Sequence, residues 1–169
     1  MEKVSTPERL DGNGLFNSLT EIGMRILFIL EAFHPGAIDL KYLAAYDYYI
    51  LHTEDIDGPQ SLHFATSSRS GEFLVRRKGI QGALLFLQRS HLIELHNDAD
   101  GQAYQITEEA TGLLDVVTAP YHEKLKHRAA WLYERHISEP LDFEEWMLNK
   151  LSETNSNPLI RTKNQEIWS

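Results

Sequence analysis

The chain has 169 residues, and 25 acidic against 16 basic side chains give it a net charge of −9. Hydrophobic residues make up 42% and charged residues 24%, which are ordinary globular values and exclude disorder throughout. The negative charge repels phosphate backbones, so strong unassisted binding to nucleic acid is disfavoured. The absence of cysteine excludes disulfides, thiolate zinc sites and a cysteine nucleophile.

The first residues, 1–15, are polar and are expected to form a flexible lead without an apolar signal segment. The longest apolar stretch, 22–33, contains Arg25 and Glu31 and is too short to span a bilayer. We therefore expect a cytoplasmic protein that has no membrane partner.

Two helices are predicted at the start of the ordered chain. Ser18 and Glu21 have the spacing of a capping box, which satisfies free amides at a helix start. The apolar residues that follow at helical spacing predict a single buried stripe: Leu19, Ile22, Ile26, Ile29, Leu30 and Phe33. Pro35-Gly36 ends this helix, and Asp39 can cap the next one.

The segment 52–71 is polar, with Gly58-Pro59 and a cluster of serines and threonines, and it predicts a long surface loop. Helical periodicity returns over residues 72–90, where Ile80, Leu84 and Leu87 share one face.

A β-hairpin is predicted next, because two short extended segments, 92–95 and 103–107, flank a turn rich in Asn, Asp and Gly. Thr107 is placed to cap a further helix, whose first turn carries two glutamates. Pro120 fits the first position of another helix, and Asp142 opens a second capping box.

The order of three helices, a hairpin and another helix is typical of a winged-helix domain. The fold class is therefore predicted to be mainly α with a small β-hairpin and extra C-terminal helices. We assign residues 16–118 to the winged-helix core and 119–152 to a C-terminal helical extension. Residues 153–169 are expected to form a mobile tail.

The helix before the hairpin would enter the DNA groove in such a domain, but its outer positions suit DNA poorly. If Ile80, Leu84 and Leu87 face the core, Leu85 and Phe86 lie outside, and only Lys78 and Gln81 could read bases. Large apolar residues on an outward face more often indicate a protein contact.

Two glycines in the same helix, Gly79 and Gly82, lower its stability by roughly 1 kcal/mol each relative to alanine. Their presence suggests the close approach of another element.

The best basic cluster of the chain comprises Arg69, Arg76, Arg77 and Lys78. One interpretation is a solvated helix face with carboxylate partners. The other is a contact with a DNA backbone or an acidic partner, without sequence specificity.

The search for catalytic residues finds no convincing site. No phosphate-binding glycine loop exists, and no pair of histidines has the spacing of a metal site. His52 and His63 lie with several carboxylates in the 52–71 segment, and a small hydrolase could be imagined there. We favour a hydrogen-bonded loop instead, and predict a protein that is not an enzyme and has no metal or cofactor.

Several segments together resemble a known family. They are 16–18, 21–25, Asp47-Tyr48, His52, Gly58-Pro59-Gln60-Ser61-Leu62-His63, 69–77, Ala119-Pro120-Tyr121 and 128–131. The chain is similar over residues 16–135 to the middle component of bacterial three-component ABC systems, a group that includes the small subunit of Lamassu-type antiphage defence.

This resemblance implies a non-catalytic adaptor that links an SMC/Rad50-like ATPase to an effector, often a nuclease, in a complex that senses foreign DNA. His63, Glu72, Leu85 and Phe86 are then the candidate partner interface. The alternative function is an autonomous winged-helix DNA-binding transcriptional regulator.

Overall fold

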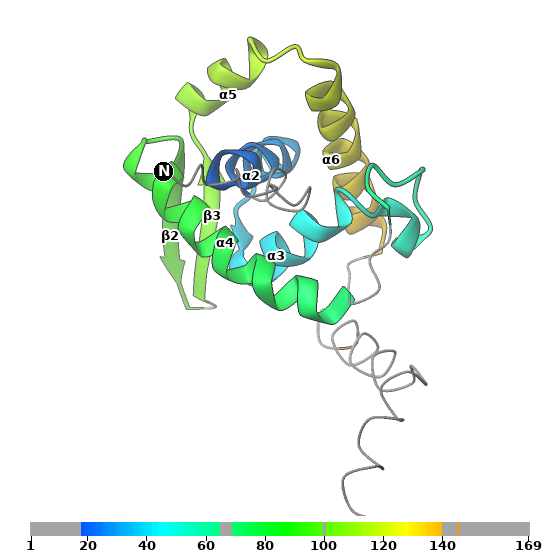
Figure 1. The fold of residues 1–169 in the computed structure, drawn as a ribbon. Helices are drawn as coiled ribbons and strands as arrows, with labels where there is room; N and C mark the ends of the chain where they lie inside the picture. The colour runs from blue at the N-terminus through cyan, green and yellow to red at the C-terminus, as the bar shows by residue number, and fades with distance from the viewer. Residues whose placement is uncertain (1–17, 65–68, 100, 140–144, 146–169) are drawn as a thin grey trace, which may run out of the picture.

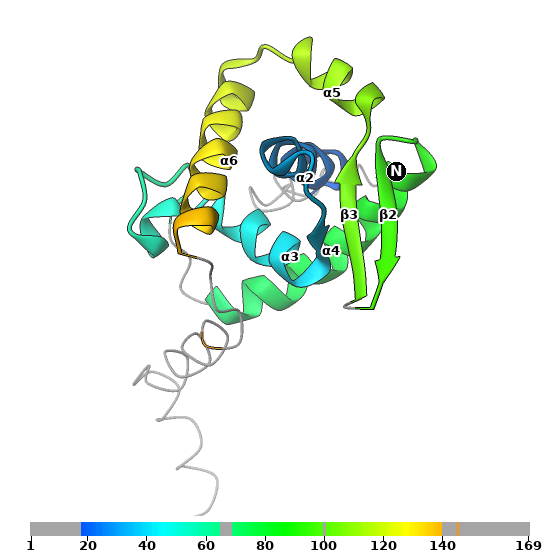
Figure 2. The ribbon, with the colours of Figure 1, turned by 180° about the vertical axis from the view of Figure 1, so that it is seen from behind.

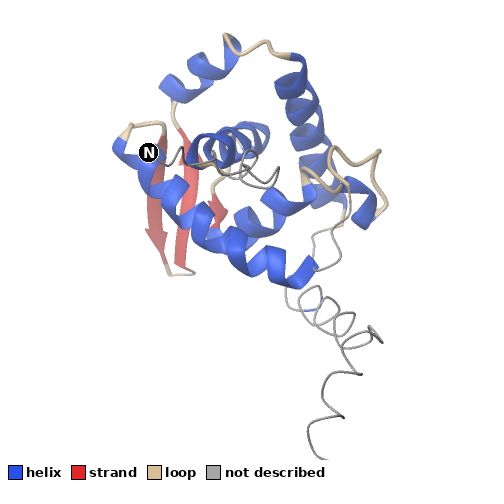
Figure 3. Cartoon of the chain, viewed as in Figure 1, coloured by secondary structure: helices blue, strands red, loops and turns tan. Residues whose placement is uncertain are grey.

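A computed structural model describes residues 18–64, 69–99, 101–139 and 145 of the chain (Figure 1). Its elements in chain order are α2 (Leu19–Phe33), β1 (Ile38–Asp39), α3 (Leu40–Tyr49), the 3₁₀ helix η1 (Thr53–Ile56), α4 (Arg69–Arg89), β2 (Ile93–Asp98), β3 (Gly101–Ile106), α5 (Glu108–Asp115) and α6 (Pro120–Ser138). The protein is mainly helical, and a small antiparallel sheet lies at one side (Figure 3).

Helix α2 lies in the middle of the molecule and contacts α3, α4, α5, α6 and β3 (Figures 1 and 2). The prediction of a single buried stripe on this helix was too narrow. Arg25, Leu27 and Phe28 are also buried, because α4 and α6 cover two different sides of it. Leu19, in contrast, is 50% exposed at its first turn.

The predicted helix starts are confirmed by their hydrogen bonds. Ser18 accepts a bond from the Glu21 amide, Asp39 from the Tyr42 amide at 2.9 Å and Thr107 from the Ala110 amide at 3.3 Å. Pro120 is the first residue of α6. The side chains of Ser18, Asp39 and Thr107 each satisfy an amide that lacks a partner within its helix.

The predicted hairpin is confirmed, and Asp98 pairs with Gly101 across its turn. The structure adds a third strand that was not predicted: β1 pairs with β3, and the strand order is β1-β3-β2. Strand β1 has only two residues, too few for an alternating pattern to be visible in the sequence.

The prediction that residues 52–71 form a surface loop holds for 57–64, which contain no helix or strand and are not buried, and is wrong at both ends of the segment. His52 is buried, and so is Thr53, the first residue of η1. Helix α4 already begins at Arg69. Residues 65–68 lie outside the described part. Backbone bonds hold the described part, including one from the Leu62 amide to the Leu51 carbonyl at 2.9 Å.

Helix α6 joins the same core through Leu125, Ala129 and Leu132. It also holds residues 52–64, which contain η1 and which we call the η1 segment, since Arg128 donates a hydrogen bond to the Gln60 carbonyl at 2.7 Å. The predicted polar lead, the capping box at Asp142 and the tail 153–169 lie outside the described residues. No described helix has both the length and the apolar character needed to cross a membrane.

Candidate protein-interaction surface

Helix α4 has two different faces. Ile80, Leu84 and Leu87 are buried against the core, as the helical spacing predicted, and Ala83 is buried beside them. On the other side Leu85 is 49% and Phe86 48% exposed, which confirms that both point outward. Large half-exposed apolar side chains side by side on a helix are typical of an interaction surface.

Polar and basic side chains flank this apolar pair. Lys78, Gln81 and Arg89 are exposed at spacings of three to eight residues, which place them along the same side of the helix as Leu85. We call Lys78, Gln81, Leu85, Phe86 and Arg89 the outer face of α4.

The two glycines of α4 lie against helix α2, which confirms that they allow a close approach. A β-carbon at Gly79 would lie 2.8 Å from Ile22 Cδ1, and one at Gly82 would lie 3.1 Å from Leu19 Cδ2. Their neighbour is therefore another helix of this chain, and they form the border between the outer face and the core.

Arg76 does not belong to an exposed basic cluster, so its assignment as a DNA or acidic-partner contact was wrong. It is 6% exposed, and its Nη1 lies 3.2 Å from Asp47 Oδ2. The same carboxylate accepts two bonds from Arg25, at 2.6 and 3.1 Å. Arg76 faces inward because it lies half a turn away from Lys78 and close to the angular position of Leu87.

The buried Asp47 stabilises the charged form of Arg25. Burial by itself acts to lower the pKa of Arg25, but the charge and hydrogen bonds of Asp47 outweigh it, so that the pKa is raised. This ion pair was not predicted from the sequence. The available sign was one basic and one acidic residue, each inside an otherwise apolar helical stretch.

Arg77 and Lys78 are exposed, and they remain candidates for contact with an anionic partner. Arg69 and Glu72 lie in the first turn of α4, and the described structure does not include their side chains. Of the four residues in the predicted basic cluster, Arg77 and Lys78 are thus the two that the structure shows to be exposed.

His63, a predicted partner contact, is directed toward α6. Its Nε2 lies 3.1 Å from the Tyr121 hydroxyl, and the two rings stack. His52 is buried with its ring stacked on Tyr48, 4.5 Å between centroids. Hydrogen bonding and ring stacking therefore hold the two histidines against the rest of the domain.

The Tyr121 hydroxyl lies next to the buried ion pair. Burial is the main cause that raises the pKa of Tyr121, while Arg25 and Arg76 act in the opposite direction. Within the described ranges no group of three His, Asp or Glu side chains could hold a metal ion.

A second part of the surface is acidic. The hollow between the hairpin and the start of α5 is lined by three glutamates, Glu94, Glu108 and Glu109, beside His34 and Thr107. All three glutamates are exposed. This side of the hairpin would repel a phosphate backbone.

Comparison with protein families gives one match that covers most of the chain. The model of the ABC-three component (ABC-3C) system Middle Component 2 matches residues 15–159. Comparisons with curated proteins and with solved structures gave no match. The matched range includes the outer face of α4, the η1 segment and α6, so the chain belongs to the Middle Component 2 family of ABC-three component systems.

Proposed function

We propose that this protein is a non-catalytic adaptor of a Lamassu-type antiphage complex, in which it links an SMC/Rad50-like ATPase to an effector, usually a nuclease, in the cytoplasm. Membership of a middle-component family supports a role between partner subunits. ATP hydrolysis, nuclease chemistry and the sensing of DNA would then belong to the complex and its other subunits.

The observation that carries the proposal is the apolar centre of the outer face of α4. Leu85 and Phe86 are half exposed near the C-terminal end of a 21-residue helix whose opposite side is core. Burying such residues against a partner is favourable, and large side chains at the centre of an interface often dominate its affinity. We assign this face to the ATPase contact.

The order of helices and hairpin supports a winged-helix domain in which α4 occupies the position of the recognition helix. Its outer face offers Lys78, Gln81 and Arg89 around two apolar side chains, a poor set for reading bases. The acidic hollow beside the hairpin further disfavours DNA. In this proposal the domain has kept the shape of a DNA reader and uses it for a protein contact.

The double variant Leu85→Glu/Phe86→Glu tests the assignment. It places two carboxylates in the centre of the proposed interface, so we expect affinity for the ATPase to fall by about 30-fold or more. The measurement is co-purification with the products of the neighbouring genes, followed by titration of the isolated partners. Circular dichroism and a melting curve should show an unchanged fold.

A matched control is available at the C-terminal end of α5, where Val116 is the capping residue. Leu113→Glu/Val116→Glu changes two other exposed apolar residues, and it should leave the complex intact. Retention of the complex by the Leu85/Phe86 variant would contradict the assignment. Should glutamate unfold the domain, Leu85→Gln/Phe86→Gln provides a milder pair for the same comparison.

The alternative function is an autonomous winged-helix DNA-binding regulator. The exposed Arg77, Lys78 and Arg89 on the helix before the hairpin are the observation in its favour. Tight, salt-sensitive and sequence-selective binding of duplex DNA by the isolated chain in a gel shift would replace the adaptor proposal with this one.

A further inference from the structure

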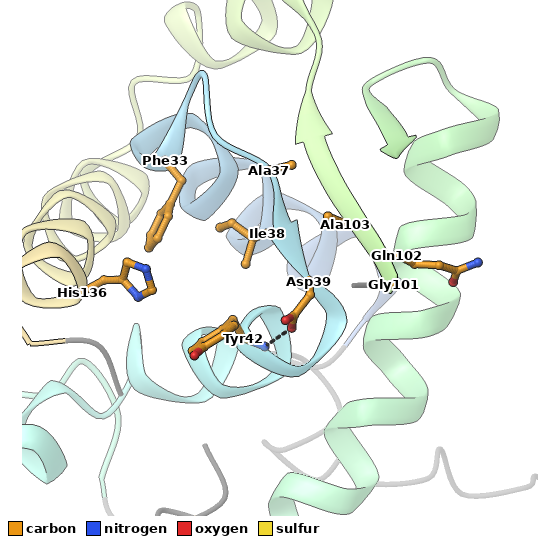
Figure 4. A pocket seen from close by; sticks show the side chains of 9 residues that line it. All are labelled: Phe33, Ala37, Ile38, Asp39, Tyr42, Gly101, Gln102, Ala103 and His136. Carbon is orange, nitrogen blue, oxygen red and sulfur yellow. Dashed lines mark hydrogen bonds between the residues drawn. The ribbon is translucent and has the colours of Figure 1, made fainter. Parts of the chain in front are cut away.

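A small pocket lies on a part of the surface to which α4 contributes no residue. It is formed by the end of α2, strand β1, the start of α3, the start of β3 and the last turns of α6 (Figure 4). Its volume is about 260 Å³. This is below the roughly 300–1,000 Å³ of typical small-molecule sites, so the pocket has the size for one long side chain.

Aromatic rings form one side of the pocket. Figure 4 shows Phe33, Tyr42 and the imidazole of His136 around the same space. The His136 ring packs edge-on against Phe33 at 5.2 Å and against Tyr42 at 5.6 Å between centroids. Tyr42 in turn stacks on Tyr46 at 5.9 Å, which fixes the plane of its ring.

The charge of the pocket is negative. Asp39 is the one carboxylate among the lining residues, and His136 is the one lining side chain that can carry a positive charge. Burial lowers the pKa of His136, and its Nδ1 forms a hydrogen bond with the Tyr46 hydroxyl. The imidazole is therefore neutral at pH 7 and does not cancel the charge of Asp39.

Asp39 retains capacity for a ligand. One of its oxygens, Oδ1, accepts the capping bond from the Tyr42 amide at 2.9 Å. A carboxylate offers about four acceptor positions, so the cap uses a minor part of them. Figure 4 shows the Asp39 carboxylate between the Tyr42 ring and the first residues of β3.

We propose that this pocket binds the cationic side chain of an arginine or lysine from a partner polypeptide. Asp39 would be its counter-ion, and Phe33 and Tyr42 would supply aromatic surfaces that attract a cation. An aromatic wall beside a single carboxylate favours a cationic group over a neutral or anionic one. The outer face of α4 and this pocket would then be two separate contacts, as an adaptor between two partners requires.

The test uses blocked single amino acids as ligands for the pocket. The isotope-labelled chain is titrated with N-acetyl-arginine amide, N-acetyl-lysine amide and N-acetyl-citrulline amide, and amide shifts are followed by NMR. The cationic probes should give saturable shifts around residues 38–42 and 101–103. Citrulline has nearly the shape of arginine without its charge, so it should bind about fivefold more weakly.

Asp39→Asn separates the charge of this residue from its capping role, because asparagine caps a helix about as well as aspartate. This variant should bind the arginine probe as weakly as wild type binds citrulline, with an unchanged melting temperature. Asp115→Asn, at the end of α5, is the matched control and should bind like wild type. If Asp39→Asn proves unstable, Tyr42→Leu tests the aromatic wall by the same titration.

Four outcomes would overturn the proposal. They are the absence of saturable shifts with the cationic probes, equal binding of citrulline and arginine, wild-type affinity in Asp39→Asn, and shifts that map outside the pocket. Guanidinium chloride serves as a further probe: if it binds as tightly as N-acetyl-arginine amide, the pocket is a site for small cations only. None of these outcomes bears on the contact through Leu85 and Phe86, so the two proposals fail independently.

Discussion

At the scale of single residues, Arg25, Asp47 and Arg76 form a buried network of ion pairs. Two guanidinium groups share one buried carboxylate at 2.6–3.2 Å. Buried charges are tolerated only when they are paired, and removing one partner leaves the other charge without compensation. The three residues come from α2, α3 and α4, so the network joins the helices that form the core.

Asp47→Asn should therefore lower the free energy of unfolding by about 3–5 kcal/mol, because both arginines lose their counter-charge. Urea denaturation followed by circular dichroism measures the change. Asp115→Asn, on the surface of α5, should stay within about 0.5 kcal/mol of wild type. A loss below about 1 kcal/mol in Asp47→Asn would mean that the network contributes little to stability.

His136 makes the stability of the folded protein depend on pH. Burial lowers its pKa in the folded state below the ordinary 6.5. As pH falls through 6.5, the unfolded chain takes up a proton that the folded chain does not, and stability decreases. This contribution is fully present above pH 6.5 and is lost toward the folded pKa.

The drop in melting temperature between about pH 7.5 and pH 5.5 should consequently be smaller in His136→Gln than in wild type. The exposed His127 offers the control, since His127→Gln should keep the wild-type dependence. Equal drops in the wild type and in His136→Gln would show that this histidine does not contribute.

At the scale of elements, the contact between η1 and α6 depends on a glycine. A β-carbon at Gly58 would lie 2.5 Å from Trp131 Cη2 and 2.7 Å from the Thr53 carbonyl oxygen. The backbone oxygen cannot move aside as a side chain can. The segment that sequence analysis treated as a loop is thus fitted closely under α6.

Gly58→Ala should destabilise the protein by about 1–3 kcal/mol, the range for overpacking. Gly112→Ala should have the opposite sign. Gly112 lies in α5 with nothing within 4 Å of a β-carbon, so alanine gains about 1 kcal/mol of helix propensity there. The melting temperatures of the two variants test both expectations. A shift of the same sign in both would contradict the packing described.

The short elements show where local patterns stop being informative. The capping residues Ser18, Asp39 and Thr107 could be identified from the sequence, because each bond joins residues three positions apart. Strand β1 could not, because its pairing partner β3 lies more than 60 residues away. The pocket with Asp39 and His136 was also missed, since it combines residues from five elements.

At the scale of the whole molecule, the net charge of −9 is unevenly distributed. Glutamates line the hollow beside the hairpin, while Lys78 and Arg89 lie on the outer face of α4. These two regions therefore differ in the sign of the charge that they offer to a partner. This distribution fits a subunit that docks in a defined orientation better than one that follows a DNA groove.

The sequence by itself determined the approximate positions of the α-helices, the caps at Ser18, Asp39 and Thr107, the hairpin and the outward direction of Leu85 and Phe86, because these follow from periodicity and from contacts within a few residues. Only the tertiary structure decided that Arg76 is internal, that Gly79 lies against α2 and that η1 packs under α6. The physical reason is that burial of a charge or a close approach of two backbones depends on which distant segment lies opposite. A helical wheel gives the direction of a side chain, whereas its partner is set by the packing of the whole chain.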